Sequence, residues 1–78
     1  MEKILTHTQA IAIHRAMAEA NNISASLRAI IPIKGGEIRV TENYRTDEIT
    51  VIRRIGYVCE SIEKFVSQAH FADFYETD

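Results

Sequence analysis

Residues 47–69 of the chain, DEITVIRRIGYVCESIEKFVSQA, decide the fold that the sequence predicts. Thr46 precedes the segment as a capping hydroxyl, and the two acids that follow it suit the positive end of a helix dipole. On a helical wheel the apolar side chains from Val51 to Ala69 fall within an arc of about 140°. We therefore predict a single amphipathic helix over 47–69, roughly 34 Å long at about 1.5 Å per residue.

Two features of the same segment leave an alternative open. Residues 49–52 are β-branched and have weak helix propensity. Gly56 would sit in the middle of the helix, at a cost of about 1 kcal/mol relative to alanine. The alternative is a strand from Glu48 to Arg53 followed by a shorter helix.

Residues 23–43 have the pattern of a β-hairpin. Side chains from Ile23 to Lys34 alternate between two faces, as they do in a strand. Gly35 and Gly36 can supply the positive φ angles of a tight two-residue turn. This turn pairs Ile33 with Ile38 and Ile31 with Val40, so that the apolar faces of the two strands agree. Pro32 lacks an N–H, so it belongs on an edge strand or at a bulge, and we expect the first strand to have one free side near it.

The first part of the chain predicts a shorter helix. Thr6 and Gln9 have the spacing of a capping box, and we expect the helix to run from about His7 to Asn21. Residues 70–78 form an aromatic and acidic tail. The prediction is thus a small single α+β domain over 1–78, in the order helix–β-hairpin–helix (αββα), with the long second helix packed on a two-stranded antiparallel ribbon.

The predicted fold leaves apolar surface without a partner. A two-stranded ribbon is marginally stable alone, and the face of the first helix is mostly alanine, which buries little area. The apolar stripe of the long helix exceeds what such a helix can cover. We therefore expect the chain to self-associate, with a dimer favoured that could extend the ribbon, or to dock on a larger protein or complex.

Composition excludes several classes of protein. The chain has 78 residues, of which 46% are hydrophobic, which argues against disorder and allows one domain. It lacks the apolar stretch that a membrane span needs, and its start does not resemble a signal peptide. Cys59 is the single cysteine, so no internal disulfide is possible and a cytoplasmic location is expected. A net charge of −2 is unlike a general nucleic-acid binder or an acidic DNA mimic.

Catalytic residue types are few and carry no motif. Cys59, His14 and His70 are the side chains that could act as nucleophile, acid or base. Their spacing matches no catalytic or metal-binding pattern. We expect no enzyme activity, no cofactor and no metal site.

The leading hypothesis is a small non-catalytic protein-binding module that inhibits or regulates a larger protein or complex by surface occlusion. Phage-encoded anti-defence inhibitors and antitoxin-like regulators are similar in size and composition. The expected partner-binding residues belong to the tail and to the charged arc of the long helix: Phe71, Asp73, Phe74, Tyr75, Glu76, Glu60 and Glu63. The alternative is a dimeric nucleic-acid-binding regulator that uses a basic β-ribbon. Its expected contacts are Arg28, Lys34 and Arg39.

Overall fold

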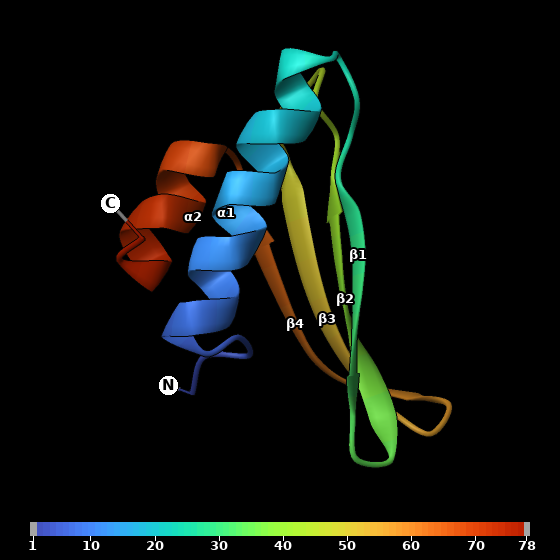
Figure 1. The fold of residues 1–78 in the computed structure, drawn as a ribbon. Coiled ribbons are helices and arrows are strands. Elements are labelled where there is room, and N and C mark those ends of the chain that lie inside the picture. Colours follow the sequence, from blue (N-terminus) through green and yellow to red (C-terminus); the bar gives the residue numbers. More distant parts are fainter. Residues whose placement is uncertain (1, 78) are drawn as a thin grey trace.

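The computed structural model describes residues 2–77 and places two helices on one face of a four-stranded antiparallel sheet (Figure 1). The elements are α1 (His7–Asn22), β1 (Arg28–Ile33), β2 (Gly36–Glu42), β3 (Ile49–Ile55), β4 (Val58–Phe65) and α2 (Gln68–Tyr75). The strand order is β1-β2-β3-β4, so each strand pairs with its neighbour in sequence. In these residues β1 and β4 form the two edges of the sheet.

The long helix predicted over 47–69 is wrong, and so are the two-stranded ribbon and the αββα order. The segment forms the antiparallel β3–β4 hairpin, and Ile55 pairs with Val58 across a two-residue turn. Gly56 in this turn has a φ of +59°, which glycine adopts without strain. The alternative strand over 48–53 largely coincides with β3, but a second strand follows it instead of a helix. The α+β class is correct.

The helical wheel fails because the β3–β4 hairpin carries apolar side chains on both faces. Val51 is fully buried beneath the helices, whereas Ile52 and Ile62 face the other way and pair with each other. An irregularity between Arg53 and Arg54 also shifts the register. Strict alternation is thus lost, and side chains of both faces merge into one apparent helical stripe.

The β1–β2 hairpin lies within the predicted range but has a different turn. Lys34 and Gly35 form the turn, so Ile31 pairs with Ile38 and not with Val40. This change moves the partner by two residues, so the same side chains still face the core. The first strand is also shorter than its alternation indicates, because β1 begins only at Arg28.

Gly36 belongs to β2 and not to the turn, for a reason that involves a third strand. It pairs with Ile55 of β3, and a Cβ on Gly36 would lie 1.8 Å from the carbonyl oxygen of Arg54. Any larger residue would push β3 away. The glycine pair therefore has two functions: Gly35 turns the chain with a φ of +79°, and Gly36 allows close strand packing.

Both helices are capped and both pack on the same side of the sheet (Figure 1). The predicted capping box of Thr6 and Gln9 is present, and α1 ends at Asn22, one residue later than expected. Ser67 caps α2, which includes most of the predicted tail. Asp78, the last residue of that tail, lies outside the described residues. Neither helix in residues 2–77 has the length and apolar character that a membrane span requires.

The core lies between the helices and the inner face of the sheet. Phe71 and Met17 are the largest fully buried side chains, and each comes from a different helix. The N-terminal segment before α1 also contributes to the core. The buried residues of the core are Ile4, Leu5, Ala10, Ile13, Met17, Ile38, Val40, Ile49, Val51, Phe65, Phe71 and Tyr75.

A buried carboxylate joins four elements at one end of this core. Glu42 is only 4% exposed, and its oxygens accept hydrogen bonds from the Asn21 amide at 3.0 and 3.2 Å. The Gln68 amide donates to it at 2.8 Å, and the Leu27 backbone N–H donates at 3.2 Å. The network connects the end of α1, the approach to β1, the end of β2 and the start of α2 through one side chain.

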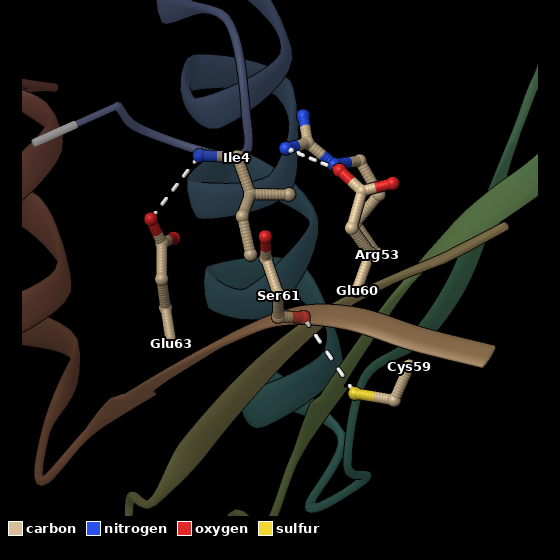
Figure 2. Close-up of polar contacts among 6 residues, drawn as sticks. All are labelled: Ile4, Arg53, Cys59, Glu60, Ser61 and Glu63. Carbon is tan, nitrogen blue, oxygen red and sulfur yellow. Dashed lines mark hydrogen bonds and ion pairs between the residues drawn. The ribbon is translucent and has the colours of Figure 1, made fainter.

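A second polar cluster fixes the N-terminal segment to the opposite side of the core. Glu63 of β4 accepts a hydrogen bond from the Ile4 backbone N–H at 3.1 Å (Figure 2). Its other oxygen accepts from the Tyr75 hydroxyl, which itself accepts from the Leu5 N–H at 3.2 Å. Burial raises the pKa of the Tyr75 phenol above its ordinary value, and the hydrogen bond to Glu63 raises it further.

Candidate functional site

The face of the sheet turned away from the helices is covered by no other element of residues 2–77 (Figure 1). Strand register aligns four side chains across its centre: Ile30, Arg39, Ile52 and Ile62. Ile30 is 62% exposed and Ile62 is 51% exposed. We call Ile30, Ile52 and Ile62 the isoleucine row, and the uncovered side of the sheet the open face.

Basic side chains surround the isoleucine row. Arg28 and Lys64 lie on one side of it, in register with Thr41 and Thr50, and Arg54 lies on the other side. Glu37 is the one acidic side chain on the strands of this described face, and it pairs with Arg39. Four basic groups against one acid give the open face an excess of positive charge, although the chain as a whole carries −2.

A hollow of about 710 Å³ lies where the open face meets the β2–β3 loop. Three arginines line it: Arg28 and Arg39 from the strands, and Arg45 from the loop. Ile30 and Tyr44 supply apolar surface, while Ser26, Thr41, Asn43 and Thr50 supply polar groups. Glu48 and the buried Glu42 also line the hollow, so its three arginines outnumber its acids by one.

Hydrogen bonds within the loop over residues 43–48, and one to Ser26, hold the backbone of Tyr44 and Arg45 in place. Ser26 accepts from the Tyr44 N–H at 3.1 Å, and the Asn43 side chain accepts from the Arg45 N–H at 3.0 Å. The Asn43 carbonyl accepts from the Asp47 N–H at 2.7 Å. The wall of the hollow is therefore an ordered turn and not a loose connection.

The β3–β4 turn forms an apolar tip at the far end of the sheet. Tyr57 is 98% exposed and Val58 is 67% exposed, and Ile55 beside them is also exposed. Figure 1 shows this hairpin reaching beyond the helices. The isoleucine row and this tip make the uncovered half of the molecule unusually apolar for solvent-exposed strands.

The aromatic residues predicted to bind a partner lie mostly in the core. Phe71 is fully buried and Tyr75 is 2% exposed, and both contact the ring of Phe65. Phe74 is half-buried against the same cluster. Asp73 and Glu76 are exposed. Of the five tail residues predicted to bind a partner, only these two acids and part of Phe74 are therefore accessible to solvent.

The two glutamates predicted beside them also have partners within the chain. Glu60 forms an ion pair with Arg53 at 3.0 Å, and Glu63 holds the N-terminal segment as described above (Figure 2). Both come from β4, and they do not share a helix face because that helix does not exist. The structure therefore brings the seven predicted partner-binding residues together only in part.

Two of the three residues predicted for nucleic-acid binding lie together in the structure. Arg28 and Arg39 line the hollow, whereas Lys34 lies in the β1–β2 turn and does not line it. Sequence reasoning missed Arg45 and Lys64, as well as the outward placement of Ile52 and Ile62. The alternation of Thr50, Ile52 and Arg54 with buried neighbours was the signal that could have found the residues on β3.

The three candidate catalytic side chains lie in ordinary environments. Cys59 is exposed, and its Sγ lies 3.9 Å from the Ser61 carbonyl oxygen (Figure 2). His14 shares a hydrogen bond with Thr77 at 2.8 Å, and His70 accepts one from the Val66 N–H at 3.4 Å. Within residues 2–77, no three His, Cys, Asp or Glu side chains converge as a metal site requires.

Comparison with protein-family models, curated proteins and solved structures finds no match to the chain. The fold and its surface are therefore the sources of a functional hypothesis. The packing of residues 2–77 leaves the open face uncovered by helices. It combines apolar area, positive charge and a hollow.

Proposed function

We propose that this chain is a small non-catalytic protein-binding module that inhibits or regulates a larger protein or complex by occluding its surface. The open face is the docking surface. The single observation that carries the proposal is the isoleucine row, which crosses the middle of the sheet with Ile30 and Ile62 more than half exposed and with basic side chains on both sides. An apolar centre with a charged rim is typical of a protein interface.

The energetics of the two faces support this assignment. The helices and the inner face already form a closed core, so Ile30, Ile52 and Ile62 are not required to complete it. Apolar β-branched side chains left partly or wholly exposed on a sheet carry a cost in water that a partner surface would relieve. Their position at the centre of the face suits them to act as anchors.

The proposal is tested by crosslinking and then by reconstitution. A photoreactive amino acid at Ile62 should crosslink the chain to one partner in cells of its source, and the same group at Ile23 should not. Ile23 is the matched control because it is 77% exposed but lies at the end of α1, away from the open face. The crosslinked partner is then identified and purified.

Binding of the purified partner is measured by calorimetry with Ile62→Asp and Ile23→Asp. We expect Ile62→Asp to weaken binding by about tenfold or more, because burying an unpaired charge opposes docking. Ile23→Asp should bind like the unmodified chain, and circular dichroism should show both variants folded. Equal crosslinking at both sites, or equal affinity of both variants, contradicts docking through the open face.

A second candidate function is nucleic-acid binding, which the three arginines of the hollow favour. It predicts an affinity that falls steeply with salt, with a slope on logarithmic axes of about −0.9 for each phosphate contact on a duplex. Arg28→Glu together with Arg39→Glu should then abolish binding. An affinity that depends weakly on salt but strongly on Ile62 favours the protein-binding function.

Self-association remains a prediction with a changed basis. The apolar stripe of the 47–69 helix was its main reason, and that helix is absent. The edges β1 and β4 are the remaining candidates for strand pairing between copies. Pro32 removes one backbone donor from β1, so β4 is the better edge for such pairing.

A further inference from the structure

Arg28 and Arg45 in the hollow have no acidic partner in the described chain. The ion pairs of residues 2–77 join Arg39 to Glu37 and Arg53 to Glu60, and neither Arg28 nor Arg45 takes part in one. Both side chains are exposed at the rim of the hollow. A guanidinium presents a planar set of donors that pairs in two-point fashion with a carboxylate or a phosphate.

The hollow places these two donors beside an apolar surface. Ile30, a member of the isoleucine row, lines it together with Arg28, and the Arg45 guanidinium lies 5.9 Å from the centre of the Tyr44 ring. The ordered 43–48 loop fixes the backbone that carries Arg45, so part of the conformational cost of binding is already met. The site thus fits a ligand in which an acidic group and an apolar group lie close together.

We propose that the hollow binds an acidic segment of the partner protein, with carboxylates paired to Arg28 and Arg45 and an apolar side chain against Ile30. This inference rests on the proposed docking function and names the chemistry of the partner. The charge of the hollow and its contact with the isoleucine row are its basis.

The same observations favour a protein segment over a nucleic acid. Sites for single-stranded nucleic acids combine a positively charged groove with several aromatic rings on which successive bases stack. Tyr44 is the aromatic residue of the hollow, and its ring already lies next to Arg45. Isoleucines offer apolar contact but no stacking surface.

The test follows the arginine side-chain and backbone amide signals of the full chain by NMR. One probe is a blocked peptide of sequence Glu-Leu-Glu-Asp-Leu, and its matched control is Gln-Leu-Gln-Asn-Leu. A third probe is an oligothymidylate strand at the same ionic strength. The acidic peptide should give saturable shifts at Arg28, Ile30 and Arg45, with an affinity about tenfold or more above that of the neutral peptide.

Three variants locate the effect. Arg28→Gln and Arg45→Gln should each reduce the affinity for the acidic peptide several-fold, with the fold retained. Arg15→Gln, on the exposed side of α1, should leave it unchanged. No saturable shift, shifts that are equal at Arg15, or equal binding of both peptides would overturn the inference. Tighter binding of the oligothymidylate than of the acidic peptide would overturn it in favour of a nucleic acid.

This inference and the docking function can fail separately. If the acidic peptide does not bind but Ile62→Asp still weakens binding of the crosslinked partner, the partner docks without a carboxylate in the hollow. If Ile62→Asp leaves partner binding unchanged, the docking function is wrong whatever the hollow binds. Ile62 is not among the residues that line the hollow, so the two experiments act on different side chains.

Discussion

The two faces of the sheet are built from alternate residues of the same strands. They differ in how far their apolar side chains are buried and their polar groups hydrogen-bonded. On the inner face Val40 and Val51 are fully buried, and the Glu42 carboxylate has a hydrogen-bond donor for each oxygen. On the open face Ile30 and Ile62 are more than half exposed. Stability is therefore concentrated on one face, and the other is available for recognition.

This difference predicts how substitutions divide between folding and binding. Inner-face changes should lower the free energy of unfolding and reduce binding only through loss of fold. Open-face changes should leave unfolding nearly unchanged and act on the partner. A chain of 78 residues has a small free energy of unfolding, so a core substitution should remove a large fraction of it. Denaturation experiments should therefore separate inner-face from open-face substitutions clearly.

The largest effect is expected from Phe71→Ala. The side chain is fully buried and contacts the rings of Phe65 and Tyr75, so its removal leaves a cavity in the core. We expect a loss of about 3–5 kcal/mol in the free energy of unfolding. Urea denaturation followed by circular dichroism measures this loss. If the alanine variant is unfolded, Phe71→Leu takes its place and should give a smaller loss of the same sign.

Ile62→Ala on the open face is the matched comparison. Its loss of stability should stay below about 1 kcal/mol, since the side chain is 51% exposed and only strand propensity changes. If Ile62→Ala costs as much as Phe71→Ala, the two faces do not divide as the structure indicates. The isoleucine row would then support the fold itself.

The division between the faces also explains what could be predicted from the sequence. The start of α1 follows from the local spacing of Thr6 and Gln9, and the β1–β2 hairpin from one-sided alternation with a glycine turn. Residues 47–69 could not be assigned in the same way. Ile52 and Ile62 are apolar but point outward, so the pattern that marks a half-buried strand is missing there.

The candidate site was predictable only where it depends on strand alternation. Arg28 and Arg39 were expected on the outer face of the hairpin, and both line the hollow. Arg45 joins them through the hydrogen bonds of the 43–48 loop, and no periodic pattern encodes such a turn. The burial of Phe71 and Tyr75 was equally hidden, because it depends on where α2 packs after the strands are placed.

The second prediction concerns the polar part of the inner face. Glu42→Ala removes the acceptor of three groups, namely the amides of Asn21 and Gln68 and the N–H of Leu27. Buried donors without partners are costly, so we expect a loss of about 2–3 kcal/mol in the free energy of unfolding. Glu42→Gln should cost less, since it retains one oxygen as an acceptor.

Glu48→Ala is the control for this network. Glu48 is exposed, and its removal should change the free energy of unfolding by no more than about 0.5 kcal/mol. Thermal and urea unfolding of all three variants give the comparison. A loss in Glu42→Ala as small as that in Glu48→Ala would show that the network fixes geometry without adding stability.

The smallest effect, but the most specific, concerns Tyr75 at high pH. Its pKa is raised in the folded chain by burial and by the hydrogen bond to Glu63, so the unfolded phenol loses its proton at a lower pH than the folded one. The stabilising difference is complete below the unfolded pKa of about 10 and is lost as pH rises above it. Stability should fall there by at most about 1.4 kcal/mol per pH unit from this group.

Tyr75→Phe separates this contribution from the titration of other groups. Near neutral pH the variant should lose about 1–2 kcal/mol, because the hydrogen bonds with Glu63 and Leu5 are gone. Above pH 10 its stability should fall less steeply than that of the unmodified chain. Tyr57→Phe should keep the full alkaline slope, since Tyr57 is 98% exposed. If stability falls with pH equally steeply in Tyr75→Phe and in the unmodified chain, folding does not raise the pKa of the Tyr75 phenol.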